Sequence, residues 1–391
     1  MSTKKFKFID LCAGIGGFHK ALSFFNGECV LVSEIDKYAI ETYKKNFGSS
    51  VFYDIKDVNK DVLPQYDLLC AGFPCQSFSK AGLRQGFNEL KGTIFFEIYR
   101  ILMETQPKFV LLENVRNLAS HDNGKTWETI KNCLKQANYT VPENPICISP
   151  LNINIPQSRE RVFIPCIHNK VSVAPINLNI PPSQKDKLSI YDILDMKLED
   201  DRYYINDYEK SVLDIWDNFL QCIPLQTIGF PIWFEYLRNV NMDEIIDLPK
   251  WKQNIILKNN NLYLHNKYNI EQWRNKYNNL QQLKPTDKKF EWQMGISNGN
   301  SLYNGIIQFR PSGVRVKSSN FVPALVAIVH VPIIGKLLRR LTPRECARLQ
   351  SFPDDFDINM NNFQAYKQFG NSVNIDVVKY VFKNTILQFI N

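Results

Sequence analysis

The feature that most constrains the fold lies near the start of the chain, where an apolar run meets a glycine-rich turn. Residues 6–12 predict a strand, and Ala13-Gly14-Ile15-Gly16-Gly17 follows it directly. Apolar residues then recur at helical spacing, at Phe18, Ala21, Leu22 and Phe25. Strand, glycine turn and helix in this order open a nucleotide-binding βαβ unit. The chain is therefore expected to build a parallel sheet with helices on both faces.

The glycine turn by itself leaves two explanations open. A dinucleotide-binding G-x-G-x-x-G pattern needs a third glycine at position 19, where this chain has His19. A tight structural turn explains the glycines about as well as a bound ligand does. An NAD-dependent dehydrogenase is disfavoured, because His19 breaks its pattern and the sequence offers no plausible hydride-transfer site.

Acidic residues follow the next two predicted strands. Residues 29–33 predict a strand that ends at Glu34, and residues 51–55 predict a short strand that contains Asp54. Glu34 is placed to accept hydrogen bonds from both hydroxyls of a ribose, and Asp54 to accept one from the exocyclic amine of a base. Either residue alone is more simply a solvated surface acid. Their repetition at successive strand ends favours a nucleotide pocket.

A candidate nucleophile follows the strand predicted at residues 66–70. The loop Ala71-Gly72-Phe73-Pro74-Cys75-Gln76-Ser77-Phe78-Ser79 places Cys75 just past the carboxyl end of that strand, where α/β sheets gather ligands. A free cysteine is more often a small buried hydrophobe, so Cys75 needs support from other residues. The segment 80–92 that follows has no clear periodicity and is typical of a functional or mobile loop.

Further polar residues lie at the ends of later strands. Residues 109–112 predict a buried strand closed by Glu113, and desolvation at the sheet edge would raise the pKa of this carboxyl toward neutrality. Arg159 and Arg161 stand two apart on an extended segment, which predicts that they point the same way. They are candidates for holding a phosphate or a substrate carbonyl, and a solvated edge strand is the alternative.

Composition limits the classes of protein that this chain can belong to. Its 391 residues suffice for two domains, and no apolar run approaches membrane-spanning length. The first residues lack a secretory signal, and the nine cysteines show neither CxxC pairs nor zinc-site spacing. We therefore expect free thiols, a cytoplasmic location and no bound metal. The net charge of +8 is weak support for a polyanionic partner.

Six stretches together resemble the DNA (cytosine-5) methyltransferase family, in its bacterial modification-type branch. They occur in the order and with the spacing of that family, across about residues 6–168 and 336–391. The stretches are residues 8–17, Gly72-Phe73-Pro74-Cys75-Gln76, Glu113-Asn114-Val115, Gln157-Ser158-Arg159-Glu160-Arg161, residues 340–345 and Gly370-Asn371-Ser372-Val373.

The resemblance implies a doubly wound, Rossmann-like α/β domain that uses S-adenosylmethionine as methyl donor. Residues Gly14 to Gly17 would line its methionine end, Glu34 would hold the ribose, and Ile35 would pack on the adenine. The remaining implied cofactor-binding residues are Cys12, Asp54, Ile55, Pro74, Ile94, Asn371 and Val373.

The resemblance also implies the chemistry. Cys75 would add to C6 of a cytosine flipped out of the duplex, and Glu113 would hydrogen-bond or protonate N3 of the base. Arg159 and Arg161 would steady the cytosine carbonyl and the adjacent backbone. Loss of the C5 proton after methyl transfer, and elimination of Cys75, would release 5-methylcytosine. The segment 80–92 is the candidate for closing over the flipped base.

The expected organisation is a catalytic domain at residues 1–172 plus 363–391 and a smaller DNA target-recognition domain at 173–362. The expected partner is double-stranded DNA, with no membrane contact. A cognate restriction endonuclease is expected as a functional rather than physical partner, and the protein is expected to be a monomer. Two alternatives stay open, a catalytically silent DNA-binding protein of this fold and a tRNA cytosine-5 methyltransferase.

Three residues depart from the pattern of the family. Cys12 stands where an aromatic residue is usual, which would make one wall of the cofactor pocket smaller. Ala324 replaces a threonine, and Ala81 replaces a serine of the mobile loop. We expect weaker cofactor packing at Cys12 rather than lost activity.

Overall fold

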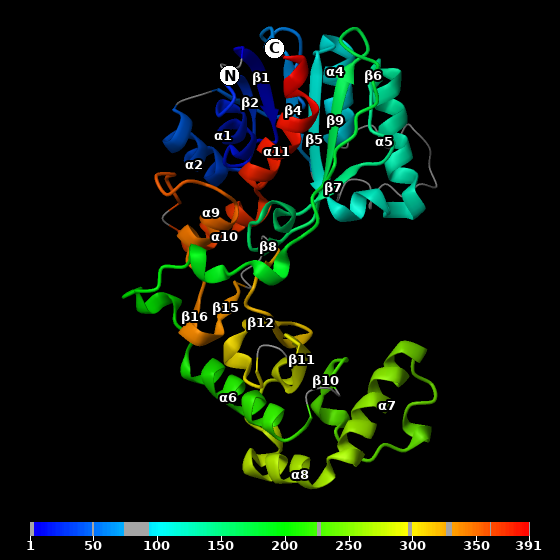
Figure 1. Cartoon of the computed structure of the whole chain (residues 1–391), viewed down its shortest axis with the longest axis vertical. Coiled ribbons are helices and arrows are strands. Elements are labelled where there is room, and N and C mark those ends of the chain that lie inside the picture. Colours follow the sequence, from blue (N-terminus) through cyan, green and yellow to red (C-terminus); the bar gives the residue numbers. More distant parts are fainter. Residues whose placement is uncertain are drawn as a thin grey trace. The chain divides into compact units, whose positions relative to one another are not determined.

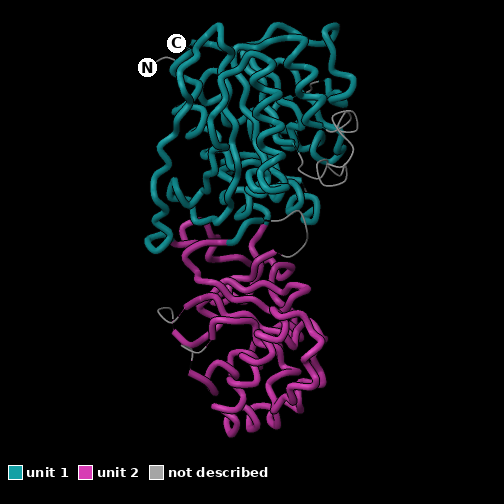
Figure 2. The backbone as a smooth tube through the Cα atoms, turned by 90° about the vertical axis from the view of Figure 1, so that its right-hand side faces the viewer, with its two compact units in different colours: residues 1–188, 323–329, 343–391 teal, residues 189–322, 330–342 magenta. Residues whose placement is uncertain are grey.

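The computed structural model describes residues 4–48, 51–73, 94–224, 228–295, 299–325, 331–359 and 361–390. The chain divides into two compact units (Figure 2). Unit 1 comprises residues 1–188, 323–329 and 343–391, and unit 2 comprises residues 189–322 and 330–342. The assignment of DNA reading to residues 173–362 stays a prediction.

Unit 1 contains an eight-stranded sheet in the order β3-β2-β1-β4-β5-β9-β6, with β7 paired to β9. The first five strands of that order run parallel, and β9 is antiparallel to β5, β6 and β7. The strands are β1 (Phe6–Leu11), β2 (Gly27–Ser33), β3 (Phe52–Tyr53), β4 (Leu68–Gly72), β5 (Phe109–Val115), β6 (Tyr139–Thr140), β7 (Ile146–Ile148) and β9 (Arg161–His168). The predicted α/β class with a mainly parallel sheet is confirmed.

Helices cover both faces of this sheet (Figure 1). They are α1 (Gly17–Ser23), α2 (Lys37–Phe47), α4 (Ile94–Thr105), α5 (Lys125–Gln136) and α11 (Ile375–Thr385). Two more helices of unit 1, α9 (Pro343–Leu349) and α10 (Asn362–Asn371), pack against each other. Side chains alternate along β1, so Ile9 and Leu11 share a core with α4 and α5. On the other face, the Phe6 ring stacks on Phe382 of α11 at 5.4 Å. Each such buried side chain stabilises the fold by roughly 1.5–3 kcal/mol.

The parallel arrangement determines where the site lies. Leu11 of β1 pairs with Ala71 of β4, and Gly72 of β4 pairs with Glu113 of β5. The carboxyl ends of these strands therefore meet at one edge of the sheet, as expected for a ligand site in an α/β fold. The third strand is shorter than predicted, because the chain turns at Asp54, whose carbonyl accepts a hydrogen bond from the Asp57 amide. Asp54 thus follows β3 instead of lying within it.

Unit 2 is built on a six-stranded sheet in the order β10-β11-β13-β12-β15-β16. These strands are β10 (Ile232–Trp233), β11 (Lys289–Gln293), β12 (Ile306–Arg310), β13 (Gly313–Lys317), β15 (Ile333–Ile334) and β16 (Arg339–Arg340). The helices are α6 (Asp207–Gln221), α7 (Lys250–His265) and α8 (Lys267–Lys276). An aromatic core joins them, in which Trp216 stacks on Phe290 at 4.9 Å.

Candidate active site

A pocket of about 590 Å³ opens at the carboxyl edge of the unit 1 sheet. Segments far apart in the sequence contribute to its walls, and all of them belong to unit 1. The lining residues are Cys12, Gly14, Ile15, Glu34, Asp36, Ala39, Gly72, Phe73, Glu113, Val115, Arg159, Arg161, Lys367, Gln368, Gly370, Asn371 and Ser372.

The glycine turn forms one wall of this pocket, and its two left-handed glycines differ in their surroundings. Gly14 has a φ of +56°, and a Cβ built on it would have no heavy atom within 4 Å. Gly16 has a φ of +86°, and a Cβ there would lie 2.3 Å from the Phe47 ring. Gly16 therefore allows close packing against α2, whereas Gly14 keeps one side open for a ligand.

Glu34 holds this turn in place. Its carboxylate accepts hydrogen bonds at 2.8 Å from the backbone N–H groups of Gly14, Ile35 and Asp36. A carboxylate offers about four acceptor positions. Glu34 thus retains about one acceptor position beyond these three backbone donors, and its contact with a ribose stays a prediction. Beside it, Ile35 is 74% exposed, which is unusual for an isoleucine and leaves an apolar surface for a planar base.

A buried acid and its cationic partner contribute to the pocket from β5 and β9. Glu113 lies within β5, which runs to Val115 and so extends beyond the predicted strand at residues 109–112. The Nε of Arg161 in β9 lies 3.1 Å from Oε1 of Glu113. Burial raises the pKa of Glu113, and the opposing charges of Arg161 and Arg159 only partly offset this. Burial also lowers the pKa of Arg161, against the attraction of Glu113. Glu113 is therefore suited to carry a proton at higher pH than an ordinary carboxyl group.

Arg159 is held differently from Arg161. It lies between β8 (Gln157–Ser158) and β9, and its side chain is buried. Its terminal nitrogens donate hydrogen bonds to the backbone carbonyls of Leu325 (2.9 Å), Gly370 (3.0 Å) and Ser372 (2.7 Å). Burial lowers the pKa of Arg159 to about 9. These bonds tie the 157–161 segment to the C-terminal segment. Arg159 and Arg161 line the same pocket, and their contact with substrate stays a prediction.

Cys12 also lines the pocket, but its thiol is a poor nucleophile. Burial raises the pKa of Cys12 to about 12, and the carboxylates of Glu34, Asp10 and Asp54 add to the shift. Only the thiolate is a strong nucleophile, so Cys12 stays inert near neutral pH.

The structure brings together about half of the site residues predicted from the sequence. Those that line the pocket are Cys12, Gly14, Ile15, Glu34, Glu113, Arg159, Arg161 and Asn371. Within the described part of the chain, the predicted residues that do not line it are Gly16, Gly17, Ile35, Asp54, Ile55, Ile94 and Val373. Pro74, Cys75 and the segment 80–92 lie outside the described residues.

The residues that do not line the pocket have identifiable positions. Gly17 packs closely on Val373, because a Cβ built on Gly17 would lie 2.6 Å from Cγ2 of Val373. Ile55 is 3% exposed and belongs to the hydrophobic core, against which Ile94 also packs. The Oδ1 of Asp54 accepts a hydrogen bond from the Lys56 amide at 3.1 Å.

Sequence reasoning missed several lining residues. Asp36 stands two residues after Glu34, and the acidic pair Glu34-Ile35-Asp36 was a usable signal for it. Lys367 and Gln368 precede the Gly370-Asn371 motif by about one helical turn, so their place on the same helix was also readable. Phe73 directly follows β4, and Val115 is the last residue of β5; both belong to motif stretches of the sequence, which was a usable signal for them.

Across the described residues, no group of three or more His, Cys, Asp or Glu side chains is arranged to hold a metal ion. None of the helices in the described ranges is both long and apolar enough to cross a membrane.

Comparison with known proteins defines the class of this enzyme. The profile of the C-5 cytosine-specific DNA methylase family matches residues 6–387, which is nearly the whole chain. The chain belongs to this family, and the predicted enzyme class, a methyltransferase, is confirmed.

Individual relatives support the same assignment. The chain is 32% identical over 378 residues to the Type II methyltransferase M.HhaI of Haemophilus parahaemolyticus, covering 97% of this chain and 93% of that protein. It is 33% identical over 380 residues to the Type II methyltransferase M.HpaII of Haemophilus parainfluenzae, covering 96% and 88%.

Solved structures share the fold at lower identity. The Dnmt2 methyltransferase of S. pombe matches with a TM-score of 0.52 and 17% identity, covering 97% of both chains. The methyltransferase EhMeth of Entamoeba histolytica matches with a TM-score of 0.53 and 17% identity, covering 97% of this chain and 98% of that one. These likenesses show the Rossmann-like methyltransferase fold.

Proposed function

We propose that this chain transfers a methyl group from S-adenosylmethionine to C5 of a cytosine flipped out of a specific sequence in duplex DNA. Its relatives M.HhaI and M.HpaII are Type II methyltransferases, which supports a role as the modification component of a restriction–modification system. One observation carries the proposal: the glycine turn with Glu34 and the buried Glu113–Arg161 pair open onto the same pocket.

The pocket suits the proposed methyl donor. S-adenosylmethionine carries a methyl group on a positively charged sulfur, which makes that methyl electrophilic. Gly14 leaves open space at the N-terminus of α1, and Glu34 keeps an acceptor position for the ribose. Ile35 does not line the pocket, but it directly follows Glu34 and offers an exposed apolar surface for adenine. Asn371 of α10 lines the same pocket, and in this proposal it contacts the donor from the C-terminal segment.

The proposed chemistry begins at Cys75. Its thiolate adds to C6 of the cytosine, which breaks the aromaticity of the ring and makes C5 nucleophilic enough to take the methyl group. A base then removes the C5 proton, and elimination restores the C5–C6 double bond and the free Cys75 thiolate. A free thiol has a pKa of about 8.5, so only a few per cent is thiolate near neutral pH, and the site must favour the addition.

Glu113 and Arg161 provide that assistance in our proposal. Glu113 donates a proton or hydrogen bond to N3 of the base, which takes up the charge that develops as the thiolate adds. Its raised pKa supports this role, because the protonated form persists toward neutral pH. Arg161 orients Glu113 through their 3.1 Å contact and steadies the cytosine carbonyl. The three carbonyl contacts of Arg159 support a positioning role for that residue.

Labelled methyl transfer tests the proposal. Purified protein is mixed with S-adenosylmethionine labelled in its methyl group and with duplex DNA of mixed sequence, and tRNA is assayed in parallel. We expect label in DNA for the wild type and none for Cys75→Ser. Cys147→Ser is the matched control, since Cys147 is another free cysteine that does not line the pocket, and it should retain activity.

The outcomes separate the alternatives. Label in tRNA but not in DNA would assign the enzyme to tRNA. Wild-type activity in Cys75→Ser would contradict the covalent mechanism. Bisulfite sequencing of the methylated DNA would then identify the recognition sequence.

A further inference from the structure

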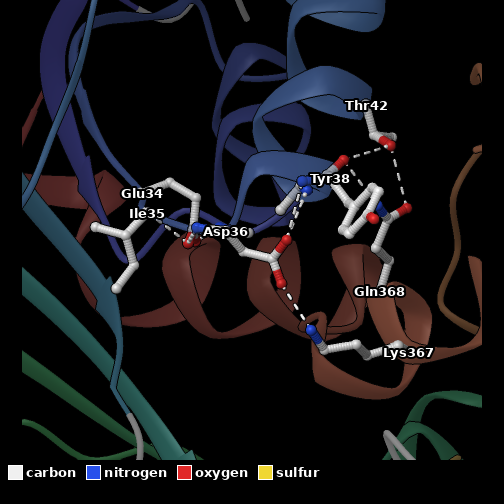
Figure 3. Close-up of polar contacts among 9 residues, drawn as sticks. Glu34, Ile35, Asp36, Tyr38, Thr42, Lys367 and Gln368 are labelled. Carbon is white, nitrogen blue, oxygen red and sulfur yellow. Dashed lines mark hydrogen bonds and ion pairs between the residues drawn. The ribbon is translucent and has the colours of Figure 1, made fainter. Parts of the chain in front are cut away.

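Helix α10, near the end of the chain, is joined to the N-terminal half of α2 by a set of polar contacts (Figure 3). The Nζ of Lys367 lies 2.7 Å from Oδ2 of Asp36. The amide of Gln368 donates to the carbonyl of Tyr38 at 2.9 Å, and its Oε1 accepts from the Thr42 hydroxyl at 3.1 Å. The contacts join residues more than 320 positions apart, so they fix one end of the chain against the other.

These contacts lie at the rim of the proposed cofactor pocket. Asp36, Lys367 and Gln368 all line it, and α10 continues into Gly370 and Asn371, which line it as well. Lys367 and Asn371 are four residues apart, so they lie on the same face of the helix. A shift of α10 that moves Lys367 would therefore also move Asn371.

The two carboxylate oxygens of Asp36 have different partners. Its Oδ1 accepts from the backbone N–H groups of Tyr38 (3.0 Å) and Ala39 (3.3 Å), which caps α2. Its Oδ2 remains for Lys367. The backbone N–H of Asp36 donates to Glu34, and Glu34 in turn accepts from Gly14. A continuous series of polar contacts thus leads from α10 to the glycine turn on the other wall of the pocket.

We propose that Lys367 and Gln368 are positioning residues for cofactor binding, and that the Asp36–Lys367 ion pair holds the C-terminal wall of the pocket closed against the glycine turn. The proposal rests on the proposed use of S-adenosylmethionine. The helix is not held by this pair alone, since Phe369 is 1% exposed and the Gln350 amide donates to its carbonyl at 3.1 Å. Variants at Lys367 are therefore expected to fold.

The test measures the dissociation constant of S-adenosylmethionine by calorimetry without DNA. Lys367→Met should weaken binding by about tenfold and raise the KM for the donor equally, with kcat at saturating donor within about twofold of wild type. Lys367→Arg keeps the cation and should restore most of the affinity. Lys45→Met is the matched control, because it removes an exposed ion pair with Glu41 on α2 outside the pocket, and it should bind like wild type.

Two further measurements separate positioning from a loss of structure. Amide hydrogen exchange in the cofactor-free protein should speed up in residues 362–373 of Lys367→Met and remain unchanged in β1. Asp36→Asn keeps the helix cap but loses the charge, so it should weaken binding of S-adenosylmethionine as much as Lys367→Met does. Because both substitutions break the same ion pair, the variant that combines them should bind no more weakly than either single variant.

The results distinguish this proposal from the proposed function. If wild-type protein does not bind S-adenosylmethionine at all, the proposed function fails. If the wild type binds the donor, three results would overturn the positioning role. Lys367→Met could bind as tightly as the wild type, or Lys45→Met could lose as much affinity as Lys367→Met. Asp36→Asn and Lys367→Met could also weaken binding additively in the double variant.

Discussion

The Nε of Arg161 lies 3.1 Å from Oε1 of Glu113, and both side chains are largely buried at 19% and 11% exposure. The pair joins neighbouring antiparallel strands, since Val115 of β5 pairs with Arg161 of β9. The pKa of Glu113 is nevertheless raised, because burial outweighs the two nearby arginines. Glu113 is thus both oriented by Arg161 and able to carry a proton at higher pH than an ordinary carboxyl group, as the proposed mechanism requires.

Replacement of Glu113 tests its role as proton donor. Glu113→Gln keeps the shape of the side chain but cannot give up a proton, so kcat should fall by about 10²–10⁴-fold. The protonated form is the active one in this account, so the wild-type rate should decline as pH rises through the raised pKa of Glu113. The variant should lack that decline. Single-turnover methyl transfer over a range of pH measures both effects, and unchanged donor affinity serves as the control.

The two arginines should behave differently when replaced. Arg159→Met removes the donors to three buried carbonyls, which should lower the free energy of unfolding by about 3 kcal/mol. Arg161→Met should cost less stability but should reduce kcat, because Glu113 loses its orienting partner. Urea denaturation and steady-state kinetics on both variants make the comparison. Equal effects on stability would argue against the positioning role of Arg159.

Alanine substitutions at Gly14 and Gly16 should separate an effect on donor binding from an effect on stability. Gly16→Ala places a methyl group 2.3 Å from the Phe47 ring, so it should lower the melting temperature clearly. Gly14→Ala meets no heavy atom within 4 Å, and its strain is limited to the left-handed φ, about 1–2 kcal/mol. Its methyl group enters the pocket instead, so it should weaken donor binding more than Gly16→Ala does. Thermal unfolding and calorimetry separate the two effects.

The stability provided by Asp36 should depend on pH. Burial raises the pKa of Asp36, but the hydrogen bonds from Lys367, Tyr38 and Ala39 outweigh it and leave the pKa below its usual value. A depressed carboxyl pKa stabilises the fold above the unfolded-state pKa, and this stability is lost as pH falls through the folded-state value. Asp36→Asn should thus be less stable than wild type at neutral pH by up to about 1 kcal/mol, since the pair is partly exposed. The gap should close in acid, and a gap that persists there would contradict this assignment.

The sequence predicts much of this site because it lies at strand ends. Apolar runs predict β1, β2, β4 and β5, and a parallel sheet brings the residues that follow them to one edge. Glu34 and Glu113 are found in this way. Arg159 and Arg161 line the same pocket, although the chain leaves regular strand geometry between β8 and β9.

Contacts between distant parts of the chain were not predictable from the sequence. Nothing local to Asp36 specifies Lys367 as its partner, because their contact depends on how α10 packs against α2. The same holds for the carbonyls of Leu325, Gly370 and Ser372, which only the folded chain brings to Arg159.

Covalent trapping on Cys75 tests the central claim most directly. Duplex DNA in which every cytosine carries fluorine at C5 contains all recognition sequences, and fluorine cannot leave as a cation in place of the C5 proton. Elimination is then blocked, so incubation with S-adenosylmethionine should yield a protein–DNA complex that survives denaturation. Peptide mapping should place the nucleotide on Cys75, and Cys75→Ser should give no complex. Failure of the wild type to form the complex, or a nucleotide attached to any other residue, would contradict the account.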